Sequence, residues 1–242
     1  MKSFNGEVAL KEDLIDEMKK HQEADDLIKG TYSEMSGKFL GCAIGCSVQS
    51  LITRRGVSIK HDDHKALGDA IGSPEWLMRL QDTLFENLPE KESKEFPVKF
   101  YQAMPVGVDL EPVKWRFCAF ILKENIERVL ALDIDEKLKE QVVDAVRGVL
   151  VLHEKAIENG NWDESAAKSA AWSAKSAAKS AAWSAESAAW SAESAAKSAA
   201  KSAESAAKSA AKSAAKSAKS AAWSAAYIKY ADELLRLLRE AK

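Results

Sequence analysis

Glycine and proline are missing from the last third of this 242-residue chain. All 11 Gly and all 5 Pro lie at or before Gly160. Because these two residues mark most changes of chain direction, their absence excludes a C-terminal domain rich in turns and indicates one regular element. Residues 1–160 and 161–242 are therefore predicted to form two different domains.

Cysteine and long apolar runs are also scarce. Three Cys are too few for a disulfide framework, and the N-terminal MKSFNGEVALKEDL lacks the apolar run of a secretory signal. No stretch reaches the roughly 18 uncharged apolar residues that are needed to cross a bilayer. We therefore expect a cytoplasmic protein with reduced thiols and no membrane partner.

Acidic and basic residues are nearly balanced over the whole chain. The chain has 35 Lys and Arg against 37 Asp and Glu, which excludes a uniformly basic nucleic-acid coat and an acidic disordered tail. Residues 165–224 hold nine Lys against three Glu, and residues 225–242 hold four basic against three acidic residues, so residues 1–164 carry the remaining -9. An acidic head and a basic tail are thus expected to attract each other, within one copy or between copies.

The apolar residues of the head recur at helical spacing. No segment alternates apolar and polar residues convincingly, so we predict no sheet. The predicted fold class is all-α, a compact helical head followed by one long, straight helix. Seven head helices are expected. The first covers residues 8–28, the second begins at about residue 39, the third runs from Asp62 or Asp63 to Gly72, and the fourth begins at Pro74. The fifth covers residues 96–103, the sixth begins after Pro112, and the seventh runs from a cap within Asp133–Glu136 to Glu158.

Residues 165–220 repeat Ser at the spacing of an eleven-residue, three-turn unit. Sixteen Ser span 55 residues in 15 intervals, or 3.67 residues per interval. This value is close to the natural turn of an α-helix, so each residue type keeps its own stripe with very little supercoiling. We predict one continuous helix from Trp162 to Glu240, roughly 120 Å long at 1.5 Å per residue.

The last turns of this helix change from alanine to aliphatic and aromatic residues. Such a face needs a partner more than the thin alanine face does. The partner is either a second copy of the chain, giving a homo-oligomer through the C-terminal helix, or the chain's own head, giving a fold-back clamp. The candidates for an oligomer interface are Tyr227, Tyr230, Leu234, Leu235 and Leu238.

Four tryptophans follow the charged stripe of the repeat rather than its alanine face: Trp172, Trp183, Trp190 and Trp223. We expect them to pack against the head or a neighbouring rod. The alternative is a track of Lys and Trp for single-stranded nucleic acid. The repeat contains no Arg and some of its charges are Glu, which argues against a nucleic-acid partner.

Two cysteines and two histidines form the most site-like pattern in the chain. Cys42 and Cys46 are four residues apart and share a helical face, as do His61 and His64, which are three apart. Two thiols and two imidazoles are a sufficient tetrahedral zinc set, so these four are the metal candidates. The sequence requires no cofactor, and zinc is the one that it allows.

Two alternatives stay open for the same segment. One of the cysteines paired with one of the histidines, and oriented by Asp62 or Asp63, would give a thiol enzyme. Otherwise, Gly41 and Gly45 form a notch for close helix packing, and the cysteines are ordinary buried residues.

Four cations near the glycine-rich turn suggest a pocket for an anionic small ligand, such as one that bears phosphate. Trp115, in the loop that leads into a core helix, is a further ligand-binding candidate. For the two arginines the alternative is a helix C-terminus that gains favourable charges. The four cations are Lys38, Arg54, Arg55 and Lys60.

No phosphate-binding loop of the GKS type, nucleophile elbow or HExxH motif is present. The chain resembles a family of uncharacterised proteins scattered through bacterial and phage genomes, over nearly its whole length. The resemblance implies that head and repeat belong together, and it implies no activity. It is carried by GCAIGCSVQS (41–50), GSPEWLMRLQDTLFENLP (72–89), MPVGVDLEPVKWRF (104–117) and RGVLVLHEKA (147–156), followed by the Ala/Ser/Trp repeat.

These patterns favour a non-enzymatic helical binding protein. We expect it to self-assemble through its C-terminal helix and to hold a small ligand or a host protein in its head. In a phage or mobile-element context this would mean host takeover or defence evasion. The alternatives are a zinc or thiol-dependent enzyme centred on the Cys/His pattern, and a single-stranded nucleic-acid binding protein.

Overall fold

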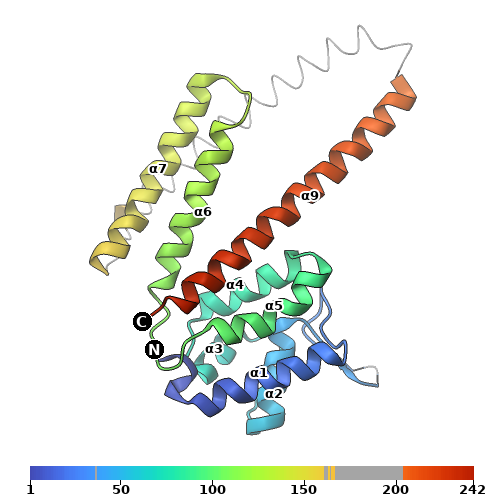
Figure 1. The fold of residues 1–242 in the computed structure, drawn as a ribbon, viewed down its shortest axis with the longest axis vertical. Helices are drawn as coiled ribbons and strands as arrows, with labels where there is room; N and C mark the ends of the chain where they lie inside the picture. Colours follow the sequence, from blue (N-terminus) through green and yellow to red (C-terminus); the bar gives the residue numbers. More distant parts are fainter. Residues whose placement is uncertain (36, 161–162, 164, 167–203) are drawn as a thin grey trace. The chain divides into compact units, whose positions relative to one another are not determined.

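The structure, a computed structural model, describes residues 1–35, 37–160, 163, 165–166 and 204–242 (Figure 1). Helices dominate these residues, and the strands among them are two segments of two residues each. The predicted all-α class is therefore confirmed. Among the described helices, none combines the length and the apolar character that crossing a bilayer requires.

The chain divides into two compact units. Unit 1 comprises Met1–Lys114 and Ala222–Lys242, and unit 2 comprises Trp115–Ala221. This division differs from the predicted domains 1–160 and 161–242, because the aliphatic end of the last helix completes the core of unit 1. Two segments that are far apart in the sequence thus belong to one folded body.

The ends of the unit 1 helices follow local sequence signals. Asp63 caps the helix α3 (His64–Ile71) by accepting a hydrogen bond from the Ala66 amide at 2.9 Å. Gly72 ends it with a φ of 65°, a left-handed conformation that glycine adopts without strain. Both ends agree with the sequence prediction. The other unit 1 elements of the N-terminal part are η1 (Ser3–Gly6), α1 (Val8–Glu23), α2 (Ala43–Arg55), α4 (Glu75–Asn87) and α5 (Glu90–Ala103).

The connection between α1 and α2 differs most from the prediction. Helix α1 ends at Glu23, and α2 begins only at Ala43. Between them, β1 (Glu34–Met35) pairs antiparallel with β2 (Phe39–Leu40). We call residues 24–42 the α1–α2 loop. This short pair is the exception to the prediction that no sheet forms.

Helix α5 is longer than the predicted helix at 96–103. It begins at Glu90 and passes through Pro97. A proline inside a helix removes one backbone hydrogen bond. Phe96 and Phe100 are buried beside it, so the burial of this apolar face outweighs the loss.

A hydrogen-bonded chain in the core of unit 1 ties α5 to the first turn of α2. The Tyr101 side chain is fully buried, and its hydroxyl donates to Ser47 Oγ at 2.7 Å. Ser47 donates in turn to the Ala43 carbonyl at 2.6 Å. These two hydrogen bonds therefore fix the start of α2 on the side that faces the core of unit 1.

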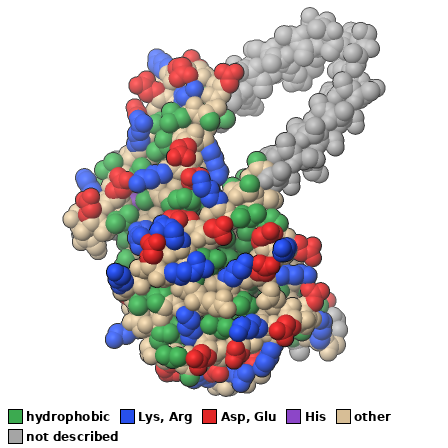
Figure 2. Space-filling view, viewed as in Figure 1, with side chains coloured by type: hydrophobic (Ala, Val, Ile, Leu, Met, Phe, Trp, Pro, Cys, Tyr) green, Lys and Arg blue, Asp and Glu red, His purple; other side chains and the backbone are tan. Residues whose placement is uncertain are grey.

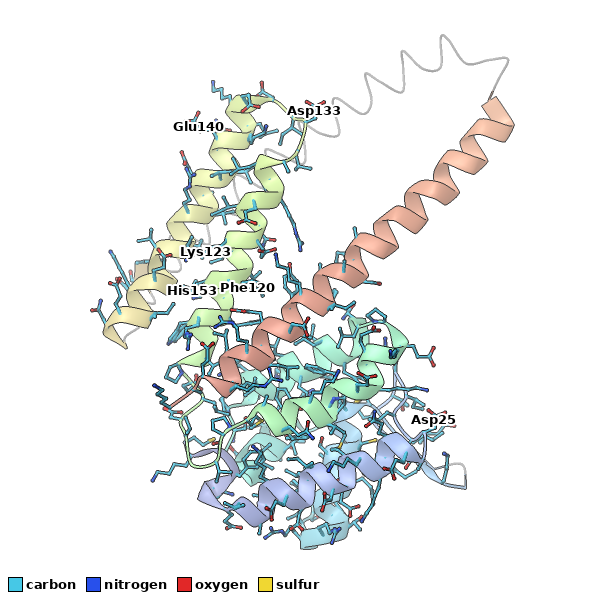
Figure 3. All side chains as sticks on the ribbon, viewed as in Figure 1. Asp25, Phe120, Lys123, Asp133, Glu140 and His153 are labelled. Atoms are coloured by element: carbon cyan, nitrogen blue, oxygen red, sulfur yellow. The ribbon has the colours of Figure 1, made fainter. Side chains whose placement is uncertain are left out.

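Unit 2 contains α6 (Val113–Leu130) from Trp115 onward and α7 (Glu136–Asn159), and the two helices lie side by side as a hairpin (Figure 1). Lys123 on α6, labelled in Figure 3, forms an ion pair at 2.9 Å with Glu154 on α7. Asp135 caps α7, within the segment where the sequence predicts the cap.

The last helix, α9 (Glu204–Arg239), is continuous over its described length. It is the C-terminal part of the single repeat helix that the sequence predicts. Near the predicted start at Trp162, Asp163 is not helical and residues 165–166 are. The rest of the prediction falls on residues 167–203, with Trp172, Trp183 and Trp190, and lies outside the described residues.

The aliphatic end of α9 is covered by its own chain. Leu234, Leu235 and Leu238 are at most 5% exposed within unit 1. These leucines therefore pack within their own chain, as the fold-back clamp predicts, and the homo-oligomer stays a prediction. Tyr227 and Tyr230 are half-buried, and their ring centroids lie 6.0 Å apart. Self-assembly through the leucines would require their release from unit 1.

This packing predicts a specific loss of stability. Leu234→Ala should lower the free energy of unfolding by about 2–5 kcal/mol, because it leaves a cavity at a fully buried position. Urea unfolding followed by circular dichroism measures the change. The matched control is Leu130→Ala at a half-exposed leucine, where we expect a much smaller loss. Equal losses in the two variants would contradict the clamp.

Candidate metal centre

The first turn of α2 accepts a backbone segment of the α1–α2 loop at unusually close range. A Cβ atom at Gly45 would lie 1.7 Å from the carbonyl oxygen of Tyr32, and one at Gly41 would lie 2.6 Å from it. No side chain fits at such distances, so both positions need glycine. The notch between the two glycines therefore holds a loop, and the prediction that it serves close helix packing is wrong.

Cys42, Asp82 and Glu86 gather beside this notch. One sulfur atom and one oxygen atom from each carboxylate all lie within 4.8 Å of one another. Cys42 is the N-cap residue of α2 and is 1% exposed. Asp82 and Glu86 are four residues apart on α4, so they lie on the same face of that helix.

One oxygen of the Asp82 carboxylate is hydrogen-bonded, and the other is available for a ligand. Its Oδ2 atom accepts a hydrogen bond from the Tyr32 hydroxyl at 3.0 Å and lies 3.0 Å from His64 Nε2. Its Oδ1 atom is buried and has no hydrogen-bond partner among the residues that the structure describes. The Tyr32 and His64 rings meet edge to face, with centroids 5.7 Å apart. The arrangement orients the carboxylate and leaves one buried oxygen for a ligand.

His64 has a bond at each ring nitrogen. Nδ1 lies 3.1 Å from the Asp62 carbonyl oxygen, and Nε2 lies 3.0 Å from Asp82 Oδ2. A histidine that activates a thiol needs a nitrogen directed at the sulfur. His64 therefore orients Asp82 rather than acting as a base for Cys42.

Burial raises the pKa of two ligand residues, Cys42 and Glu86, and of the neighbouring Tyr32. Desolvation, with the charge of Asp82 nearby, raises the pKa of the Cys42 thiol to about 12. Desolvation also raises the pKa of Glu86, although the Gly30 amide donates to both of its oxygens. Burial and the bond to Asp82 raise the pKa of Tyr32 to about 12. The cluster therefore favours either protons or a bound cation.

The other two predicted ligands are engaged elsewhere. Cys46 Sγ donates to the Gly41 carbonyl at 3.4 Å. His61 Nε2 lies 3.1 Å from Gln49 Oε1, and its ring lies 5.2 Å from that of Phe39. Of the predicted set of two Cys and two His, the structure thus brings only Cys42 and His64 to the cluster.

Three of the four predicted anion-binding cations are paired with carboxylates. Arg54 binds Glu17 at 2.7 Å, Arg55 binds Asp13 at 2.9 Å, and Lys38 binds Asp26 at 3.1 Å. Lys60 is exposed. The predicted anion pocket is therefore not formed, and the two arginines lie in the last turn of α2, as the alternative interpretation had it. Figure 2 shows acidic and basic side chains interspersed over the visible face of unit 1.

Trp115 belongs to unit 2, whereas the cluster belongs to unit 1. Its ring lies 5.9 Å from the ring of His153 on α7 (Figure 3). The described contacts therefore place Trp115 in the helical hairpin.

Sequence reasoning missed Asp82, Glu86 and Tyr32. The available signal was weak: two carboxylates four residues apart in α4, on either side of the buried Leu84 and Phe85. Acidic residues at this spacing are common on solvated helix faces. Nothing in the local sequence marks this pair as the one that faces Cys42.

The burial of the thiols predicts slow alkylation. In native protein at pH 8, iodoacetamide should modify Cys42 and Cys46 at least about 100-fold more slowly than in urea, because burial raises the pKa of both thiols. Mass spectrometry of the digested protein measures each cysteine separately. Modification of Cys42 at the unfolded rate would contradict its burial and would favour the thiol-enzyme alternative.

The Glu17–Arg54 pair predicts a pH dependence of stability. Burial opposes ionisation of Glu17, but hydrogen bonds from Lys20 and Arg54 prevail and hold its pKa below the ordinary value. The stability from this group is therefore present above its unfolded pKa, and it is lost as the pH falls through its folded pKa. Glu17→Gln should cost about 1 kcal/mol at pH 7 and much less at pH 3, by urea unfolding.

Glu95→Gln is the control for this experiment, because Glu95 pairs with Lys99 at the surface of one helix. Its effect on the unfolding midpoint should be small at both pH values. If Glu17→Gln has the same effect at pH 3 as at pH 7, the lowered pKa is wrong.

Comparison with protein-family models, with curated proteins and with solved structures finds no match to this chain. The resemblance to bacterial and phage proteins therefore stays a prediction. The chemistry of the Cys42, Asp82 and Glu86 cluster is the basis for the functional interpretation.

Proposed function

We propose that the chain is a non-enzymatic binding protein that binds one divalent transition-metal ion, with zinc as the best fit, in unit 1. The ligands are Cys42, Asp82 and Glu86. The observation that supports the proposal is the convergence of one thiol and two carboxylates within 4.8 Å.

The donor set matches zinc better than the hard cations. Zinc accepts sulfur and carboxylate oxygen together, whereas calcium and magnesium take oxygen ligands. Zinc bonds of about 2.0–2.3 Å place tetrahedral ligands about 3.3–3.8 Å apart. The three atoms are at most 4.8 Å apart, so small side-chain rotations close the set. Water supplies the fourth ligand.

Electrostatics favours the same occupant. Asp82 and Glu86 are like charges four residues apart, and burial raises the pKa of Glu86. A divalent cation stabilises both carboxylates and the Cys42 thiolate, and it displaces the thiol proton as it binds. Binding therefore relieves the cost that burial imposes on these groups.

Two observations favour binding over thiol catalysis. Burial raises the pKa of Cys42, which makes the free thiol a poor nucleophile. Both ring nitrogens of His64 contact other acceptors, so His64 directs no base at the sulfur. The chemistry at Cys42 is that of a metal ligand.

Zinc titration tests the proposal. The full chain, purified with chelator and then dialysed, should bind one equivalent of zinc by isothermal titration calorimetry. Asp82→Asn and Cys42→Ser should weaken binding about 100-fold or more, because each removes an anionic ligand and nearly preserves shape.

Cys46→Ser is the matched control, since Cys46 bonds to a backbone carbonyl and lies outside the ligand set. It should retain the affinity of the wild-type chain. A wild-type chain that binds no zinc would overturn the proposal, as would equal losses in Cys42→Ser and Cys46→Ser.

A further inference from the structure

The α1–α2 loop is attached to the rest of unit 1 through the residues that form the metal centre. The Gly30 amide donates to both carboxylate oxygens of Glu86, at 3.1 and 3.0 Å. The Tyr32 hydroxyl donates to Asp82. These bonds join Gly30 and Tyr32 of the loop to both carboxylates of the cluster.

The third ligand residue contacts the same stretch. The Cys42 amide donates to the Thr31 carbonyl at 2.8 Å. The carbonyl of Tyr32, the next residue, fills the notch at Gly41 and Gly45. Residues 30–32 thus contact all three ligand residues, and they do so through atoms other than the buried Asp82 Oδ1 and the Cys42 sulfur.

We infer that metal binding and the position of residues 30–32 are coupled, with Tyr32 as a positioning residue for Asp82. The inference rests on the proposed metal centre and concerns its regulation. Zinc fixes the two carboxylates, and the fixed carboxylates hold the loop. In return, a seated loop orients Asp82 for zinc.

The physical basis is the capacity of the carboxylate oxygens. Each oxygen has two lone pairs, so a carboxylate can accept from the loop and bind a cation together. Without a cation, the two adjacent carboxylates repel each other, which weakens their hold on the loop. Hydrogen bonds to a ligating carboxylate typically change metal affinity by about 10–100-fold. Thermodynamic linkage then requires that bound zinc raise the equilibrium constant for seating the loop by the same factor by which the seated loop raises zinc affinity.

Two variants separate the loop from the ligands. Tyr32→Phe removes one hydroxyl and keeps the ring against His64. Gly45→Ala places a methyl group where the Tyr32 carbonyl lies, and so displaces the loop. Each variant should bind zinc about tenfold more weakly than the wild-type chain, although neither removes a ligand.

Matched controls carry the same chemical changes away from the loop. Gly148→Ala adds a methyl group in α7 that meets no other described part of the chain within 4 Å beyond its own helix backbone and chain neighbours, and Tyr227→Phe removes a hydroxyl from α9. Both should bind zinc as the wild-type chain does. Circular dichroism shows whether Gly45→Ala is folded. If Gly45→Ala does not fold, the zinc affinity of Tyr32→Phe alone tests the coupling.

Cobalt gives a readout that a purely structural role would not change. The wild-type chain loaded with cobalt should show a thiolate-to-metal charge-transfer band. In Tyr32→Phe at saturating cobalt this band and the visible bands should shift, because Asp82 loses its orientation. Spectra identical to those of the wild-type chain would show that Tyr32 does not position the ligand.

Hydrogen exchange measures the reverse direction of the coupling. With zinc, the amides of Gly30 and Cys42 should exchange about tenfold more slowly in the wild-type chain, and the gain should be smaller in Tyr32→Phe. If zinc binds but these amides and the affinity of Tyr32→Phe are unchanged, the coupling is wrong and the metal centre stands. If the wild-type chain binds no zinc, the proposed function fails, and the coupling fails with it.

Discussion

The carbonyl of Tyr32 rests against the first turn of α2, where glycine at positions 41 and 45 leaves room for it. This approach fixes the α1–α2 loop on α2 and brings the loop's phenol to Asp82. From the other side, the Tyr101 and Ser47 hydroxyls fix the same turn to α5. The position of the ligand cluster therefore depends on the first turn of α2, which contacts the α1–α2 loop and α5. It also depends on Gly41 and Gly45, because a side chain at either position would displace the loop.

Burial determines what this cluster can hold. Carboxylates and thiols are costly to ionise away from water, and the raised pKa values of Cys42 and Glu86 reflect this cost. The Tyr32 and Gly30 donors offset part of it, and no described residue donates to the Asp82 Oδ1 atom. The divalent ion that we propose would satisfy all three ligands at once.

The sequence predicts the parts of this molecule that local chemistry decides. Asp63 and Gly72 mark the ends of α3 because a cap and a left-handed glycine act within one turn. Cys42 and His64 could be selected as site candidates because cysteine and histidine are rare in the chain. Asp82 and Glu86 could not, since among 37 acidic residues only the packing of α4 against α2 distinguishes them.

The aliphatic end of α9 shows the same limit on a larger scale. Its leucines require burial, but an amphipathic face does not specify whether the partner is the same chain or another. Closing a longer loop costs only slightly more entropy than closing a shorter one, whereas binding a second molecule loses translational freedom. Covalent connection therefore favours the chain's own head, and the clamp closes unit 1 from both termini.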